Sequence, residues 1–148
     1  MREMWLTLQE RQLIWLLRWW VGVFLATAIV FAFFPAELIY WMNIVGKTIF
    51  HWHHEWLPPP TEHFWQVLSV SLLIVLTYVA FEAQRDIRQN FSFVKIIILS
   101  KIVTTLGFLC AFIFDGVYFV YLSGMIIDLS VLLLTWFCYS RSSASRAL

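Results

Sequence analysis

The fold is decided by the stretch from residue 92 to residue 140, which reads SFVKIIILSKIVTTLGFLCAFIFDGVYFVYLSGMIIDLSVLLLTWFCYS. It holds two long apolar runs, 92–114 and 117–140, and only Asp115 and Gly116, a pair typical of a tight turn, separate them. A helix rises about 1.5 Å per residue, so each run is long enough to cross a hydrocarbon core of about 30 Å. This half of the chain predicts two antiparallel membrane-spanning helices.

Two more apolar runs lie upstream. Residues 19–36 and residues 64–81 each hold 18 residues without a charged side chain. A cleavable signal peptide is the competing interpretation of the first run, because Ala26-Thr27-Ala28 has the small residues of a cleavage site. Six apolar residues follow that tripeptide and two glutamates precede the run, so we favour a retained span that Pro35 ends or kinks.

The sequence therefore predicts an all-α integral membrane protein built as a four-helix bundle. The transmembrane domain occupies residues 13–140, between an amphipathic N-terminal segment and a basic, serine-rich tail. The expected boundaries are 1–12 for the N-terminal segment, 13–36, 63–82, 92–114 and 117–140 for the spans, and 141–148 for the tail.

The segment between the first two spans, residues 38–60, mixes aromatic side chains with lysine, histidine and glutamate. Such mixtures are typical of the membrane–water boundary. We expect an additional helix over 38–56 that lies in or near the interface, ended by the prolines at 58–60. Thr61 is the expected N-cap of the next span, with Glu62 in its first turn.

The composition excludes several classes of protein. Of the 148 residues, 61% are hydrophobic and 13% are charged, whereas soluble domains have about 25% charged residues. A soluble enzyme and a disordered chain are therefore excluded. A net charge of +1 without a long basic run also argues against nucleic-acid binding.

Lysine and arginine are distributed unequally between the two predicted sides of the membrane. One side receives only Lys47, and the other receives Arg2, Arg11, Arg18, Arg85, Arg88, Lys95, Arg141 and Arg146. Because the positive side faces the cytoplasm, both termini are expected there. The expected location is a bacterial cytoplasmic (inner) membrane.

Asp128 lies inside the fourth predicted span and Lys101 inside the third. A carboxylate near the middle of a membrane is costly and marks a candidate functional site. Counted from the Asp115 turn, the two residues differ in depth by only about 3 Å, so an ion pair that fixes the helix register is one interpretation. The alternatives are a neutral Asp128 hydrogen-bonded to a neighbour such as Thr104, and a ligand or proton site that also includes Tyr121.

All four histidines lie within 13 residues, from His51 to His63. On a helix, His51, His54 and Glu55 would share one face, and His63 would approach after the prolines. Imidazole and carboxylate groups suit zinc, copper or iron, although this spacing matches no established motif. A haem ligand, an interaction or proton-responsive surface, and ordinary interfacial histidines remain alternatives, and no cofactor is assigned.

Small and polar residues form a stripe on each span. The first span carries Gly22 and Ala26, one turn apart, and the third carries Ser100, Thr104, Gly107 and Ala111 on one face. Such stripes favour helix packing in a bilayer, where helices associate through small residues. A polar-lined cavity between the helices is compatible with the same pattern.

Residues 18–46, with the exit Phe33-Phe34-Pro35-Ala36-Glu37-Leu38, resemble the opening helix of the DoxX-like small four-helix bacterial membrane proteins. In that family, an apolar helix with small residues leads to a proline and a short amphipathic stretch. The resemblance implies a four-span architecture and a setting beside redox or envelope functions. The later spans show no matching glycine pattern, so the resemblance assigns no functional residue.

These patterns predict a non-catalytic accessory or scaffold subunit that lies in the lipid bilayer beside larger membrane protein subunits. A different hypothesis is a small binder or carrier of a lipid, quinone or proton, with a polar cavity around Asp128, Lys101, Thr104 and Tyr121. A third is a metal or redox site on the outer face at His51, His54, Glu55 and His63. The sequence has no nucleophile triad or phosphate-binding loop, so enzyme activity is not expected.

Overall fold

The computed structural model describes residues 6–59 and 63–144, and all the regular elements in these ranges are helices. The helices are α1 (Leu8–Phe33), α2 (Pro35–Ile49), α3 (His63–Arg85), α4 (Phe91–Phe114) and α5 (Phe119–Ala144). Four of them, α1, α3, α4 and α5, are long and apolar enough to cross a membrane. The predicted all-α class and the four long apolar helices are therefore confirmed.

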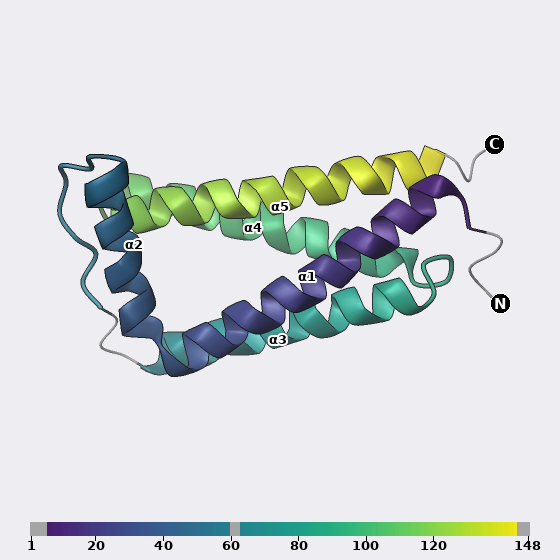
Figure 1. Ribbon diagram of the computed structural model, residues 1–148, viewed down its shortest axis with the longest axis horizontal. Coiled ribbons are helices and arrows are strands. Elements are labelled where there is room, and N and C mark those ends of the chain that lie inside the picture. Colours follow the sequence, from purple (N-terminus) through teal and green to yellow (C-terminus); the bar gives the residue numbers. More distant parts are fainter. Residues whose placement is uncertain (1–5, 60–62, 145–148) are drawn as a thin grey trace.

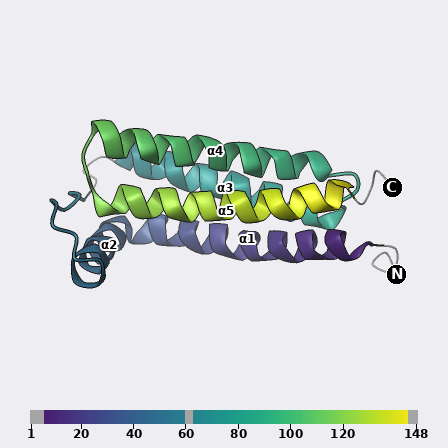
Figure 2. The ribbon, with the colours of Figure 1, turned by 90° about the horizontal axis from the view of Figure 1, so that it is seen from above.

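The four long helices form two antiparallel pairs. Helix α1 packs mainly against α3, and α4 packs mainly against α5, with smaller contacts between α3 and α4 and between α1 and α5. The two pairs lie close together where α1 begins and α5 ends, and they diverge toward the other end (Figure 1). The short helix α2 lies across that diverging end, while the long helices run nearly parallel in the view of Figure 2.

The apolar core lies in the half of the molecule where the two pairs converge. Its buried members come from all four long helices and from the α3–α4 turn: Leu13, Leu17, Phe24, Leu76, Val79, Ala80, Ala83, Ile87, Val94, Ile97, Ile98 and Val131. In the diverging half, the buried positions among the described residues are Ala28, Asn43, Gly46, Phe119 and Val120. The packing that joins the two pairs is therefore concentrated at one end.

Helix α2 is attached to α5 through a close approach at Gly46. A Cβ atom added to Gly46 would lie 2.6 Å from Cγ of Phe119, so only a glycine lets this ring pack against the helix backbone. Both residues are buried. This contact fixes one end of α2 on the second helix pair.

Helix α1 begins earlier than predicted. The Thr7 hydroxyl accepts a hydrogen bond from the Glu10 amide at 3.2 Å, and the Glu10 carboxylate accepts one from the Thr7 amide at 2.9 Å. This reciprocal capping box starts the helix at Leu8, so residues 8–12 continue directly into the span. Helix α1 therefore continues through the boundary expected after residue 12 without a break, and residues 1–5 lie outside the described part of the chain.

Helix α2 also has different limits from those predicted. The break at Pro35 is present, because α1 ends at Phe33 and proline occupies the first position of α2, where its missing N–H is not needed. The helix predicted to continue to residue 56 ends at Ile49 instead. His51 adopts a left-handed conformation with φ of 51°, and the Trp52 amide donates to the Gly46 carbonyl at 3.0 Å, which closes the helix end.

The remaining helix ends differ from the prediction by a few residues. Helix α3 continues to Arg85 rather than 82, with an Arg85–Glu82 ion pair of 3.1 Å in its last turn. Helix α5 begins at Phe119 rather than 117 and continues to Ala144, so the first part of the predicted tail is helical. The expected cap at 61–62 and residues 145–148 lie outside the described residues.

Candidate functional site: a buried ion pair

Lys101 of α4 and Asp128 of α5 form a buried ion pair. The Lys101 ammonium donates a hydrogen bond to Oδ1 of Asp128 at 2.6 Å, and the two side chains are only 7% and 12% exposed. Each residue lies about 14 to 15 Å along its helix from the first residue of that helix. The two charges thus meet well inside the long helices, as the equal depths counted from the Asp115 turn predict.

The first helix pair contributes an aromatic ring to this site. The ring centroid of Phe24, on α1, lies 5.1 Å from the Lys101 nitrogen, and Phe24 is itself buried. A cation over an aromatic face is attracted by the negative charge density of the ring, more strongly where water is excluded. Phe24 therefore links the ion pair of the second helix pair to the first.

A second polar contact joins α1 to α5 about two turns further along α5. Trp20, one turn before Phe24, stacks on it at a centroid distance of 6.1 Å, and its indole N–H donates to the Thr135 hydroxyl at 3.0 Å. Thr135 is fully buried and donates in turn to the Val131 carbonyl. These contacts pair Lys101 with Asp128 and Trp20 with Thr135, whereas the buried Thr105 hydroxyl, one turn after Lys101, has no hydrogen-bond partner among the described residues.

The stability of the fold depends on this pair because both charges are buried. Burying a single charge costs several kcal/mol, whereas a hydrogen-bonded pair offsets that cost through mutual attraction. Removal of one partner leaves the other charge buried and uncompensated. The pair has no net charge, and it fixes the register of α4 against α5. At this depth, apolar packing would otherwise set that register.

Two residues predicted to share this site lie elsewhere. The Thr104 hydroxyl donates to the Lys101 carbonyl at 3.4 Å, and the Tyr121 hydroxyl donates to the carboxylate of Asp115 at the α4–α5 turn. Tyr121 precedes Asp128 by seven residues, or about 10.5 Å along the helix. The predicted set of Asp128, Lys101, Thr104 and Tyr121 is therefore divided between the buried pair and the turn.

The structure does not gather the histidines into a metal site. Among residues 6–59 and 63–144, no three His, Cys, Asp or Glu side chains lie close enough to hold a metal ion. His51, His54 and Glu55 follow the end of α2 as exposed residues, so the helical face predicted for them does not form. His63 begins α3 and its ring contacts the Gln66 side chain at 3.1 Å.

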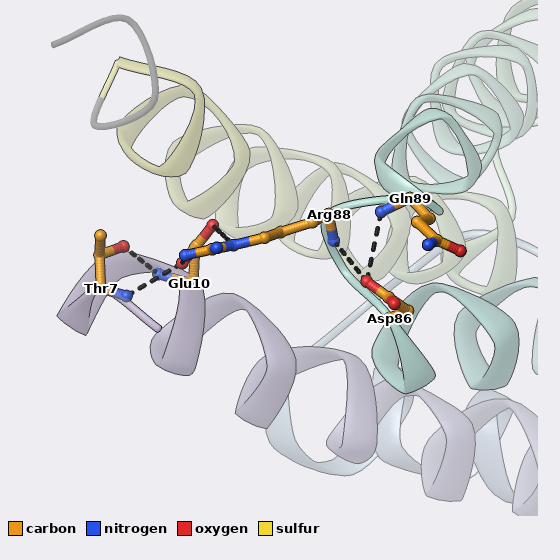
Figure 3. Close-up of polar contacts among 5 residues, drawn as sticks. All are labelled: Thr7, Glu10, Asp86, Arg88 and Gln89. Atoms are coloured by element: carbon orange, nitrogen blue, oxygen red, sulfur yellow. Dashed lines mark hydrogen bonds and ion pairs between the residues drawn. The ribbon is translucent and has the colours of Figure 1, made fainter. Parts of the chain in front are cut away.

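Sequence reasoning missed a second buried charge, Glu10. This carboxylate is 1% exposed and pairs with the Arg88 guanidinium, whose Nε and Nη2 atoms each lie 3.4 Å from a Glu10 oxygen (Figure 3). Asp86 orders the same turn by accepting hydrogen bonds from the Arg88 and Gln89 amides. The spacing Thr7-x-x-Glu10, a capping-box pattern, was the available signal in the sequence.

The Glu10–Arg88 contact joins the start of α1 to the α3–α4 turn. Arg88 reaches back from this turn to the first helix, where its guanidinium meets the Glu10 carboxylate. The converging end of the molecule is therefore closed by an ion pair as well as by apolar packing.

No protein-family model, no curated protein and no solved structure matches this chain. The resemblance to the DoxX-like proteins stays an expectation from the sequence. Any functional assignment is consequently argued from the residues of this chain alone.

Proposed function

We propose that this protein is a non-catalytic accessory subunit of a membrane protein complex. It associates laterally with the transmembrane helices of larger protein subunits. The observation that supports the proposal is a contrast between the inside and the outside of the molecule. The inner charged and indole groups are paired, in the Lys101–Asp128 and Trp20–Thr135 contacts, whereas small residues on the outside are open.

The open face belongs mainly to α1. Gly22 and Ala26 lie one turn apart and are both exposed, and a Cβ atom added to Gly22 would have no neighbour within 4 Å. Gly107 on α4 is open in the same way, whereas a Cβ atom on Gly124 would meet the Phe108 ring at 2.8 Å. In lipid, small residues let two helix backbones approach closely, so an unused small-residue face suits a partner helix.

The proposal includes an orientation in the membrane, which we infer from the distribution of lysine and arginine between the two ends of the molecule. The converging end carries Arg11, Arg85, Arg88 and Arg141, and the diverging end carries Lys47. By the positive-inside rule, the converging end, where α1 begins and α5 ends, faces the cytoplasm, and the membrane is the inner membrane of a bacterium. Helix α2 then lies at the membrane–water interface on the side opposite the cytoplasm, which suits its Tyr40 and Trp41.

The test is purification of a C-terminally tagged chain from native membranes in mild detergent, with mass spectrometry of the proteins that co-elute. Stoichiometric larger membrane subunits are the expected result. A lone monomer or a homo-oligomer would contradict the proposal and would favour a carrier of a lipid, quinone or proton.

Two variants locate the contact. Gly22→Leu adds bulk to the open face at a position where an added Cβ atom has free space, and we expect about tenfold less co-eluting partner, equivalent to about 1.4 kcal/mol. The matched control is Val75→Leu, which enlarges an exposed apolar side chain on a different helix, α3. Equal recovery of partner with Gly22→Leu and with the control would remove this face from the proposal.

A further inference from the structure

A small cavity lies between α2 and the segment that follows it, at the diverging end of the molecule. Its volume is about 310 Å³, near the lower limit for small-molecule sites. The lining includes Glu37, Tyr40 and Asn43 from α2 and Trp56, Leu57 and Pro59 from the returning segment. None of these residues belongs to the ion-pair centre or to the open face of α1.

Two aromatic rings form a corner of this cavity. The rings of Tyr40 and Trp56 lie 5.9 Å apart between centroids at an angle of 71°, and both side chains remain about half exposed. Glu37, one turn before Tyr40, lines the same cavity with a carboxylate. Aromatic faces at an angle to one another, together with a negative charge, are the groups that recognise an ammonium ion in proteins.

The cavity is held in shape by Asn43. Its side-chain amide donates to the Leu57 carbonyl at 3.0 Å, and its oxygen accepts from the Leu57 amide at 3.3 Å. Asn43 is 6% exposed, and this double contact attaches the Trp56–Leu57 wall to the helix. Because the wall is fixed by the chain itself, a ligand does not have to order it on binding.

A positive charge lies beside the aromatic corner. The Lys47 ammonium is placed over the Trp56 ring at 5.7 Å from the centroid. Lys47 itself does not line the cavity, and it follows Glu37 by ten residues, or about 15 Å along the helix. Its contact shows that the Trp56 ring accepts an ammonium, which is the group that a ligand of this cavity would present.

The surroundings of the cavity favour a lipid as the source of that ligand. Phe33 and Phe34, which directly precede α2, are 72% and 55% exposed, so apolar surface leads from the cavity onto the long helices. Acyl chains would lie along this surface while the headgroup occupies the cavity. We propose that the cavity between α2 and residues 56–59 binds the ammonium-bearing headgroup of a zwitterionic phospholipid, with Glu37, Tyr40 and Trp56 on the ammonium.

This inference rests on the proposed membrane placement of α2 and not on the partner proposal. The experiment is native mass spectrometry of the purified full chain in detergent, titrated with phosphatidylethanolamine, phosphatidylcholine or phosphatidylglycerol. The first two carry an ammonium and the third does not. We expect the ammonium lipids to bind about twofold to fivefold more tightly than phosphatidylglycerol, which is the range for a cation–π contact at a half-exposed site.

Four variants test the assignment of residues. Glu37→Gln keeps the shape of the side chain and removes its charge, and we expect about threefold to fivefold weaker binding of the ammonium lipids. Its matched control is Glu55→Gln, an exposed carboxylate that does not line the cavity. Trp56→Leu is expected to weaken binding by a similar factor, whereas Trp65→Leu, an exposed tryptophan on α3, leaves binding unchanged.

Two outcomes would overturn the inference. The first is equal binding of all three lipids, or equal binding by Glu37→Gln and Glu55→Gln. The second is displacement of phosphatidylethanolamine by free phosphoethanolamine at the same concentration as the lipid, which would assign the cavity to a soluble ammonium compound. Either result leaves the co-purification test of the partner proposal unaffected, so the two proposals fail separately.

Discussion

At the scale of single residues, the centre of the molecule depends on a pair of charges and the ring beside it. Lys101 and Asp128 are complementary in charge and equal in depth, and Phe24 covers the ammonium from the other helix pair. The pairing was predictable because depth can be counted from the Asp115 turn. The ring was not predictable, because nothing in the sequence separates Phe24 from thirteen other phenylalanines until the packing of α1 against the second helix pair is known.

Replacement of Asp128 by alanine tests whether the pair is structural. Asp128→Ala leaves the Lys101 ammonium buried and unpaired, and we expect a loss of about 3 to 5 kcal/mol in the free energy of unfolding. Denaturant-induced unfolding in detergent micelles, followed by circular dichroism, measures it. The double variant Lys101→Met, Asp128→Leu removes both charges and should recover most of the stability. A double variant no more stable than Asp128→Ala would contradict this account.

At the scale of the elements, the long helices were predictable and their ends were less so. The apolar runs had to be long because a helix that crosses a bilayer satisfies its backbone internally over its whole length. The end of α2 depends on the left-handed backbone of His51, a conformation uncommon outside glycine that the chain composition does not signal. The burial of Glu10 depends on how the α3–α4 turn folds back, which is a tertiary contact.

The attachment of α2 gives a prediction at this scale. Gly46→Ala places a Cβ atom 2.6 Å from the Phe119 ring, so α2 must move away from α5. We expect faster hydrogen exchange of the α2 amides and faster proteolysis in residues 50–59, with the long helices unchanged. Gly22→Ala is the matched control, since its Cβ atom has free space and the helix gains up to about 1 kcal/mol from alanine. Equal exchange in both variants would show that the Gly46 contact does not hold α2.

At the scale of the whole molecule, the packing is uneven. The core and the Glu10–Arg88 pair join the two helix pairs where α1 begins, and α2 lies between them at the diverging end (Figure 1). The ion pair and the aromatic cavity accordingly lie in different parts of the molecule. The ion pair lies next to the core, and the aromatic cavity belongs to α2 and its following segment. The sequence pattern identified the charged pair but gave no signal for the cavity, because Asn43 and Leu57 meet only in the folded chain.

The proposed orientation is tested by labelling from one side of the membrane. In a background with Cys110 and Cys138 replaced by alanine, Glu55→Cys should react with a membrane-impermeant maleimide in intact cells whose outer barrier has been opened. Ser143→Cys, at the opposite end of the molecule, should react only after the inner membrane is lysed. Equal labelling of both positions in intact cells would contradict the four-span orientation.

The order of the helices along the chain has a consequence for how the protein enters a bilayer. Helices α4 and α5 are consecutive, only four residues separate them, and they carry both members of the buried pair. A lysine or an aspartate inserted alone costs about 2.5 to 3.5 kcal/mol at the centre of a membrane. Because the two charges belong to one hairpin, they can neutralise each other as soon as that hairpin forms, before α1 and α3 dock. The hairpin therefore contains both members of the pair, and neither charge needs an ionic partner from α1 or α3.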